Sequence, residues 1–190
     1  MPQPAGQDVQ PDDDALMRRL AAGERAALEA LYRRHAGRVF ATAYHFLLDE
    51  QDACDITQAV FAGLERAAHR YRARGRFAAW LRRVVVNRCL NHRARAERRL
   101  RRAGPADDAL AGLAAPERER PDRRAEQRQQ MDRLRRALLR LPARQRLALI
   151  LKRFDDLSYA EIATALDCSP AAVESLLHRA RRRLQRLLAD

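Results

Sequence analysis

Apolar residues recur every three or four positions along most of this chain, which is the period of an amphipathic helix. In the segment 51–71, QDACDITQAVFAGLERAAHRY, residues Ile56, Val60 and Leu64 form one apolar stripe. A similar stripe runs through residues 28–47. Aromatic residues make up only 5% of the chain and glycines number 7, a composition that also disfavours an all-β fold. The pattern therefore predicts an all-α protein.

The segment 72–102, RARGRFAAWLRRVVVNRCLNHRARAERRLRR, admits two interpretations. The three valines at 84–86 taken alone would suit a strand. Phe77, Leu81 and Val84 have helical spacing, however, and the arginine-rich continuation favours a helix. We predict a helix for this segment.

The composition changes over residues 103–122, AGPADDALAGLAAPERERPD, which hold three prolines, five acidic residues and no sustained apolar period. Such a segment is typical of an extended or flexible linker. Helical spacing resumes beyond it at Met131, Leu134 and Leu138. The chain is therefore predicted to form two small helical domains joined by a flexible linker.

Two helix starts lie close together near the C-terminus. In SYAE, Ser158 and Glu161 match a capping box, in which each side chain bonds the other residue's backbone amide. In SPAAV, Ser169 has the position of an N-cap and Pro170 that of a first helical residue. Two helices separated by so short a turn predict a helix-turn-helix.

The second of these helices sorts its residues by face at about 100° per residue. Val173, Leu177, Ala180 and Leu184 face inward. The opposite face carries Ala171, Ser175, His178, Arg179 and Arg182. Small and hydrogen-bonding groups come first and cations follow, as expected where the start of a helix meets base edges and flanking cations meet phosphates. A plain helical hairpin with a solvated arginine face is the alternative.

Charge strengthens the nucleic-acid interpretation. The 190 residues carry a formal net charge of +13 and a sequence pI near 11.1, which favours a polyanionic partner. The excess is concentrated, because residues 66–102 contain fourteen arginines and one acid, Glu97. The segment 103–122 is net negative, with five acids against two arginines. A surface evolved for solubility would instead mix the two signs.

Other classes of protein are disfavoured. No apolar stretch approaches the ~18 residues of a membrane span, and the polar, acidic N-terminus is unlike a signal peptide. The three scattered cysteines suit a reducing compartment, so we expect a cytoplasmic protein without membrane insertion. Cys89 and His92 are too few to hold zinc, which takes about four ligands. With no Gly-rich phosphate loop and no plausible nucleophile–base pair, we expect neither a metal, nor a cofactor, nor an enzyme.

Four motifs occur in an order that resembles one known family, the extracytoplasmic-function (ECF) sigma factors of bacterial RNA polymerase. The motifs are DITQAVF, FAAWLRRVVVNRCLNH, LPARQRLALILKRFDDLSYAEIATAL and SPAAVESLLHRARRRL. The resemblance implies an acidic disordered tail at 1–14, sigma region 2 at 15–102, a linker at 103–125 and sigma region 4 at 126–190. It implies a transcription initiation factor that directs core RNA polymerase to specific promoters and assists their melting.

The resemblance also assigns residues and partners. DITQAVF is similar to the helix that binds the clamp of the polymerase's largest subunit, which makes Asp55, Gln58 and Phe61 core-binding residues. Core packing is an equal alternative for Phe61. Implied partners are the clamp and flap regions of core RNA polymerase, promoter DNA and an anti-sigma factor.

Two groups of residues are implied to bind DNA. Those for the minus-ten element are Arg76, Arg82, Arg83, Asn87 and Arg88. The arginines would neutralise phosphates, Asn87 would bond an extruded base, and the loop at 71–76 would wall its pocket. Trp80 fits the apolar stripe better than a stacking platform. Those for the minus-thirty-five element are Ser169, Ala171, Glu174, Ser175, His178, Arg179 and Arg182.

Four positions depart from the family pattern: Cys54 and Ala59 replace usual acids, Asn91 replaces a usual aspartate, and Leu176 replaces a common arginine. These departures are expected to alter the clamp contact, a local salt bridge and one DNA contact. The charge alone would also permit an architectural protein that coats nucleic acid without sequence preference. Such a protein would need neither DITQAVF nor a patterned second helix.

Overall fold

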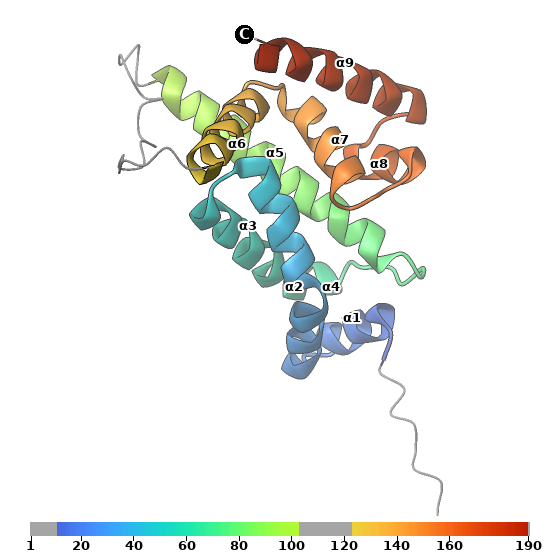
Figure 1. Ribbon diagram of the computed structural model, residues 1–190. Coiled ribbons are helices and arrows are strands. Elements are labelled where there is room, and N and C mark those ends of the chain that lie inside the picture. The colour runs from blue at the N-terminus through green and yellow to red at the C-terminus, as the bar shows by residue number, and fades with distance from the viewer. Residues whose placement is uncertain (1–10, 103–122, 190) are drawn as a thin grey trace, which may run out of the picture.

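The computed structural model describes residues 11–102 and 123–189 (Figure 1). Over these ranges the regular structure is entirely helical, as the hydrophobic pattern predicts. The helices, in chain order, are α1 (Asp13–Ala21), α2 (Arg25–Leu47), α3 (Glu50–Ala62), α4 (Leu64–Ala68), α5 (Phe77–Arg102), α6 (Arg123–Leu139), α7 (Ala143–Arg153), α8 (Tyr159–Leu166) and α9 (Pro170–Ala189).

Side-chain caps explain where several helices begin. The carboxylates of Asp12 and Asp49 accept from the amides of Ala15 and Asp52, which starts α1 and α3. The predicted capping box at the start of α8 is confirmed, since Ser158 and Glu161 bond each other's amides at 3.3 and 3.0 Å.

The N-terminal unit, α1 to α5, is built around α2, which packs against α1, α3 and α5. Leu31, Phe46, Val60, Val86 and Cys89 are among its buried side chains. The segment 72–102 is helical from Phe77 onward, so the strand interpretation of its three valines is excluded. The helix is favoured because Leu81, Val85 and Val86 lie on one helical face buried in the core, whereas a strand would turn the adjacent Val85 and Val86 to opposite faces.

Two predicted boundaries shift. Helix α1 begins at Asp13, inside the segment 1–14 that was expected to be a disordered tail, because Leu16, Met17 and Leu20 form a buried stripe behind the Asp12 cap. Helix α6 begins at Arg123, inside the expected linker 103–125. The rest of both predictions, residues 1–10 and 103–122, lies outside the described residues.

The C-terminal unit contains the predicted helix-turn-helix. Helix α8 ends at Asp167, which has a left-handed φ of 53°, and α9 starts at Pro170 as expected. The Ser169 hydroxyl accepts from the Ala172 amide at 3.2 Å. Ile162 and Leu166 of α8 and Val173 and Leu177 of α9 are buried together with α7. The apolar face of each helix is thus the one that the spacing predicts.

The two units pack against each other, which the sequence does not predict. Helix α5 runs between α2 and α3 on one side and α7 and α8 on the other (Figure 1). One continuous group of buried side chains includes Phe46 and Val85 of the first unit with Leu151 and Ile162 of the second. The described parts of the chain therefore form a single packed body.

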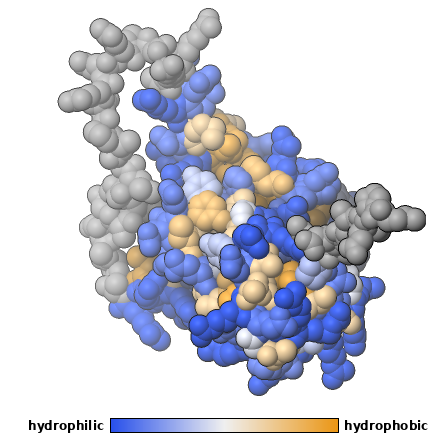
Figure 2. All heavy atoms as spheres, turned by 90° about the horizontal axis from the view of Figure 1, so that it is seen from below, coloured by the Kyte–Doolittle hydropathy of each residue, from blue (hydrophilic) through white to orange (hydrophobic). Residues whose placement is uncertain are grey.

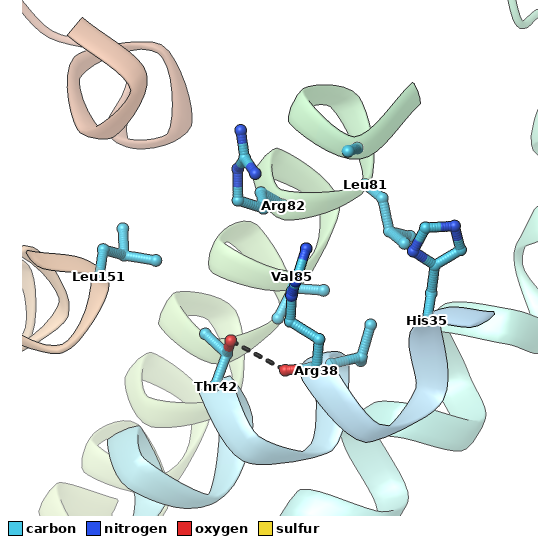
Figure 3. Close-up of a pocket in the computed structure, with 9 residues that line it drawn as sticks. His35, Arg38, Thr42, Leu81, Arg82, Val85 and Leu151 are labelled. Atoms are coloured by element: carbon cyan, nitrogen blue, oxygen red, sulfur yellow. Dashed lines mark hydrogen bonds between the residues drawn. The ribbon is translucent and has the colours of Figure 1, made fainter. Parts of the chain in front are cut away.

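A small cavity of about 20 Å³ lies at this boundary, lined by α2, α5 and Leu151 of α7 (Figure 3). It has room for about one water molecule. Three of its lining side chains are basic: His35, Arg38 and Arg82. Carboxylates of the second unit, those of Asp155 and Glu161, bond Thr42 and Arg82 of this lining.

No helix in the described ranges is long and apolar enough to cross a membrane. Figure 2 looks onto the molecule from below the view of Figure 1 and shows hydrophobic side chains in patches between hydrophilic ones.

Arg146 of α7 is fully buried beneath the boundary between the units. Its guanidinium carbon lies 4.5 Å from the centre of the Phe46 ring, and one nitrogen makes a long 3.5 Å hydrogen bond to the Leu138 carbonyl. Nε and Nη2 have no hydrogen-bond partner among the described residues. Burial, and then the charge of Arg93, lowers the pKa of Arg146 to about 10. The packed arrangement thus contains a poorly compensated buried charge.

Replacing this charge with an apolar chain of similar length is expected to stabilise the protein. We expect Arg146→Met to raise the free energy of unfolding by about 1 kcal/mol, since apolar replacements of buried charges are often stabilising. Thermal unfolding measures the effect, and the exposed Arg140→Met is the control for loss of a charge. A melting temperature that falls for Arg146→Met alone would show that the cation–π contact outweighs the desolvation cost.

Candidate nucleic-acid interface

Helix α9 presents one continuous polar face. All seven residues implied for the minus-thirty-five element are exposed, of which Ser169 is the N-cap just before α9: Ser169, Ala171, Glu174, Ser175, His178, Arg179 and Arg182. Arg179 donates through Nε to the Ser175 carbonyl at 3.2 Å, which holds its side chain along the helix. A groove beside this face is lined by Tyr159 of α8 and by residues of α9 that include Ser175, His178 and Arg179. The polar face of α9 is thus accessible along its length.

Leu176 is half-buried and packs against the hydrophobic core. The family resemblance implied that Leu176 replaces an arginine of α9 and thereby removes one DNA contact. Its side chain instead contributes to packing between α9 and the rest of the unit. An arginine at this position would therefore lose apolar contacts as well as add a charge.

The second basic surface belongs to α5 and the residue before it. Arg76, Arg83, Asn87 and Arg88 are exposed, and Arg82 is half-buried. The structure thus gathers the residues predicted for the minus-ten element on α5 and its N-terminal approach. Trp80 packs against the core and its ring lies 5.2 Å from that of Tyr71, as its place in the apolar stripe indicates.

Two of these arginines are already paired with the helix-turn-helix. Arg82 bonds the Glu161 carboxylate at 3.3 Å, and Arg83 lies 3.0 Å from that of Asp167. Hydrogen bonds from Ser158, first from its backbone amide, lower the pKa of Glu161, so this carboxylate is ionised at neutral pH. Carboxylates of the second unit therefore stand where the phosphates of DNA are expected.

A third carboxylate, that of Asp155, reaches the first unit after α7. It accepts from the Thr42 hydroxyl at 3.2 Å, and the charges of Arg38 and Arg82 act on it. Burial is the largest influence and raises the pKa of Asp155, while the Thr42 bond and these arginines oppose the shift. Phe154 stacks on His45 beside it, with ring centroids 3.8 Å apart. The contact combines a hydrogen bond, the attraction of nearby basic groups and ring stacking.

Two of the three α3 residues predicted to bind the polymerase lie on an accessible surface. Asp55 and Gln58 are exposed and lie one turn apart. Phe61 is only 4% exposed and packs edge-on against Tyr32 with ring centroids 4.8 Å apart. Phe61 is therefore a core residue here, and Tyr32, which is 47% exposed, presents the aromatic surface at this point.

The other three positions that depart from the family pattern lie on α3 and α5. Cys54 and Ala59 are partly buried on α3, and Asn91 is exposed on α5. His92, next to Asn91, lies 3.4 Å from the Asp52 carboxylate and supplies an ion pair there when protonated. An ion pair between His92 and Asp52 thus joins α5 to α3 beside Asn91, which replaces the family's aspartate.

The cysteines give no sign of a metal centre. Within residues 11–102 and 123–189, no three His, Cys, Asp or Glu side chains come together as a metal site. Burial raises the pKa of the Cys89 thiol to about 12, so this sulfur stays protonated.

Sequence reasoning missed three acidic residues, Asp14, Asp155 and Asp167, and the exposed Tyr32. Each acts through a partner far away in the sequence, such as Tyr71 for Asp14 and Thr42 for Asp155. The only local signal was the Asp12–Asp14 run before a helical stripe.

A helix-turn-helix with an exposed polar face, joined to a second helical unit with an arginine-rich helix, defines the class of DNA-binding transcription proteins. Family comparison agrees for both units: residues 31–99 match the model described as sigma-70 region 2, and residues 131–184 match that of sigma-70 region 4.

Whole-chain relatives narrow the family. The RNA polymerase sigma-H factor of Pseudomonas aeruginosa is 30% identical over 95% of each chain. The ECF RNA polymerase sigma factor SigM of Mycobacterium tuberculosis is 34% identical over 93% of this chain and 84% of its own. This chain belongs to the ECF sigma factors, and its function is that of a promoter-specific transcription initiation factor.

Solved structures agree with the fold. CnrH in complex with the cytosolic domain of CnrY is 27% identical, with a TM-score of 0.62 over 93% of this chain and 97% of that one. The sigma factor RpoE in complex with the anti-sigma factor NepR, from Bartonella quintana, has a TM-score of 0.63 over 85% and 96% at 20% identity, a likeness of fold.

Proposed function

We propose that three surfaces divide the work of initiation. Asp55 and Gln58 on α3 bind the clamp of core RNA polymerase. Arg76, Arg82, Arg83, Asn87 and Arg88 bind the minus-ten element, and the exposed face of α9 from Ser169 to Arg182 binds the minus-thirty-five element. The observation that carries the proposal is the α9 face, on which Ala171, Ser175, His178, Arg179 and Arg182 are all exposed and run from small and hydrogen-bonding groups to cations.

The chemistry of each DNA surface fits a different part of the promoter. Hydroxyl and imidazole groups near the start of α9 hydrogen-bond base edges, and the arginines further along neutralise phosphates. On α5, arginines bind the backbone of the opened strand, while the Asn87 amide offers both a donor and an acceptor to a base. Binding at two elements through one polymerase converts two weak contacts into one specific contact.

The packed arrangement is the closed form of this protein. Arg82 and Arg83 neutralise phosphates less well while they are paired with Glu161 and Asp167. DNA binding by α5 is therefore stronger once the second unit leaves, and core polymerase favours this step by binding the two units at a distance from each other. The poorly compensated charge of Arg146 lowers the cost of opening, because water reaches the guanidinium once the units separate.

Membership of the family supports three further proposals. We propose an anti-sigma factor as a regulatory partner, supported by the likeness to CnrH, which was solved with the cytosolic domain of CnrY. We place the protein in the cytoplasm, where its polymerase and promoter partners are found. We assign it no enzymatic activity, in line with the DNA-binding role of its surfaces.

Position along α9 should separate sequence reading from backbone binding. We expect Ser175→Ala or His178→Ala to change the preferred minus-thirty-five sequence by roughly 1–3 kcal/mol at one or two base pairs. Arg182→Ala should weaken all sequences equally and reduce the salt dependence by about one phosphate contact. Holoenzyme binding to a randomised minus-thirty-five library at two salt concentrations measures both effects.

Arg186→Ala, one turn beyond Arg182, is the control for losing a cation from the same helix. If Arg182→Ala reorders the sequence preferences while the Ser175 and His178 variants leave them intact, α9 is docked differently. If neither the wild type nor any variant prefers one minus-thirty-five sequence over another, the protein coats DNA without sequence preference.

A further inference from the structure

The loop between α4 and α5 precedes the surface proposed for the minus-ten element. Residues 72–76 are exposed at every position. Gly75 has a φ of +66°, a left-handed conformation that favours glycine. A loop with this shape and so little burial needs support from outside itself if it is to hold one conformation.

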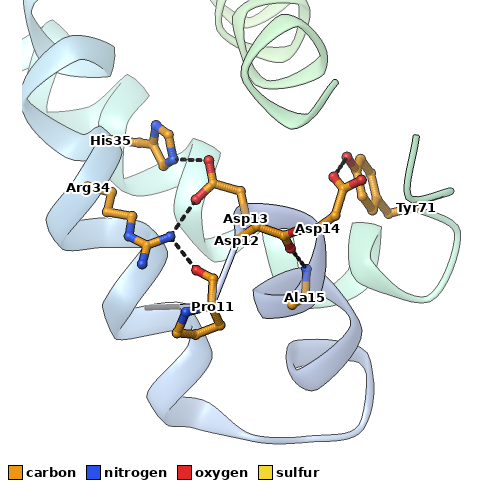
Figure 4. A network of polar contacts seen from close by, with 8 residues as sticks. All are labelled: Pro11, Asp12, Asp13, Asp14, Ala15, Arg34, His35 and Tyr71. Carbon is orange, nitrogen blue, oxygen red and sulfur yellow. Dashed lines mark hydrogen bonds and ion pairs between the residues drawn. The ribbon is translucent and has the colours of Figure 1, made fainter. Parts of the chain in front are cut away.

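One carboxylate supplies that support. Asp14 of α1 is only 8% exposed. Its Oδ1 accepts from the Tyr71 hydroxyl at 2.5 Å (Figure 4). Its Oδ2 accepts from the Gly75 amide at 2.6 Å. The two bonds reach Tyr71, just before the loop, and Gly75, near its end, so that Arg72 and Arg74 lie between them. Asp14 therefore fastens the loop to α1 at two points.

The charge of Asp14 suits this role. The Tyr71 hydrogen bond, followed by those of the loop backbone and the charge of Arg18, lowers the pKa of Asp14 despite the opposing effect of burial. The carboxylate is thus ionised at neutral pH and accepts from both donors. Because the folded pKa is depressed, this stabilisation is present above the ordinary aspartate pKa and is lost as pH falls through the depressed value.

Helix α1 is itself held in place by separate contacts. The Asp13 carboxylate bonds Arg34 at 3.0 Å and His35 at 2.9 Å, which ties the start of α1 to α2 (Figure 4). On the other side, the Tyr71 ring packs against Phe77 and Trp80 at the start of α5. The neighbouring acids Asp13 and Asp14 therefore hold different parts of the structure, α2 and the loop.

We propose that Asp14 is a positioning residue for minus-ten recognition, fixing the loop at 72–76 so that it can receive a base of the opened promoter strand. The ligand class is a single-stranded deoxynucleotide whose base has left the stack. Discrimination between bases requires the recognising groups to be held within about 0.5 Å, which an unsupported exposed loop does not provide. The inference rests on the proposed function of α5 as the minus-ten surface.

The test compares two isosteric substitutions in reconstituted holoenzyme. Asp14→Asn keeps the side-chain volume but turns an NH₂ group toward one of the two donors. Asp13→Asn weakens the attachment of α1 to α2 and leaves the loop bonds intact. Both are measured on forked promoter DNA with a randomised, single-stranded minus-ten element, and on a randomised minus-thirty-five library. Hydrogen exchange at the Gly75 amide reports on the loop directly.

We expect Asp14→Asn to lose roughly 10-fold of base discrimination at one or two minus-ten positions, about the effect of one mismatched base pair. The minus-thirty-five preferences and assembly with core polymerase should not change. The Gly75 amide should exchange faster in Asp14→Asn and at the wild-type rate in Asp13→Asn. Tyr71→Phe, which removes one of the two bonds and keeps the ring, should give a smaller loss in the same direction.

Equal minus-ten preferences in wild type and Asp14→Asn would overturn the inference, as would the same loss in Asp13→Asn. If Asp14→Asn does not fold, Tyr71→Phe takes its place in the test: minus-ten preferences equal to those of the wild type would overturn the inference. A wild-type holoenzyme without any minus-ten preference would instead refute the proposed function of α5. The exchange rate of the Gly75 amide in wild type and Asp14→Asn would then still show whether Asp14 holds the loop.

Discussion

Asp55→Arg combined with Gln58→Ala is expected to abolish assembly with core RNA polymerase. Both side chains are exposed on one face of α3 and have no polar partner among the described residues, so their loss leaves the fold intact. We expect the free energy of unfolding to change by less than about 0.5 kcal/mol, as is usual for surface substitutions. A reversed charge at a buried interface costs several kcal/mol, enough to prevent binding. Co-purification with core enzyme and thermal unfolding measure the two quantities.

Glu29→Arg is the matched control, because it makes the same change of charge on an exposed position of α2. It should assemble and transcribe as the wild type does. Normal assembly of the double variant would show that the polymerase binds elsewhere. Tyr32→Ala then examines the exposed aromatic ring beside Phe61 as the alternative contact.

Asp155→Lys is expected to open the closed form. The half-buried carboxylate is subject to the charges of Arg38, Arg82 and His45, so a lysine would bring a fourth basic group into the same place. A change of this kind costs about 3 kcal/mol or more where charges are partly desolvated. The free protein should then bind single-stranded minus-ten DNA at least ~10-fold more tightly, because the competent form is no longer a minor population. Fluorescence anisotropy measures the binding, and small-angle X-ray scattering measures the separation of the units.

Asp132→Lys changes the net charge equally at an exposed position of α6 and serves as the control. It should raise DNA affinity only through added charge, with an unchanged radius of gyration. If the two variants bind DNA alike, or if Asp155→Lys stays compact, the closed form does not limit DNA binding. The holoenzyme offers a further check: if polymerase holds the units apart, as we propose, both variants should behave alike in it.

Local features of the sequence determined most of the helices and the helix-turn-helix. Apolar spacing placed the buried faces of α5 and α9, because a helix repeats the same face every three or four residues. The Ser158–Glu161 capping box and the Ser169–Pro170 pair fixed two helix starts, because a cap involves only residues up to three positions apart. The α9 polar face followed from the same periodicity.

Phe61 shows where local reasoning reached its limit. Its position in DITQAVF was compatible with either a polymerase contact or the core, and only the placement of Tyr32 across it decided for the core. The α1 boundary was likewise mispredicted, because three successive aspartates resemble a solvated tail. Two of them, Asp13 and Asp14, have partners on α2 and in the loop before α5.

Tertiary structure alone decided the relations between distant charges. Asp14 meets Tyr71 and Gly75 across 57 and 61 residues, and Arg82 meets Glu161 across 79. No periodicity signals such pairs, since each depends on how packed helices bring separate segments together. The sequence by itself determined that this protein has two helical units with basic DNA-binding faces. Packing of α7 and α8 on α5 determined that one of those faces is occupied by the protein's own carboxylates, because burial of the shared apolar surface holds opposite charges at contact distance.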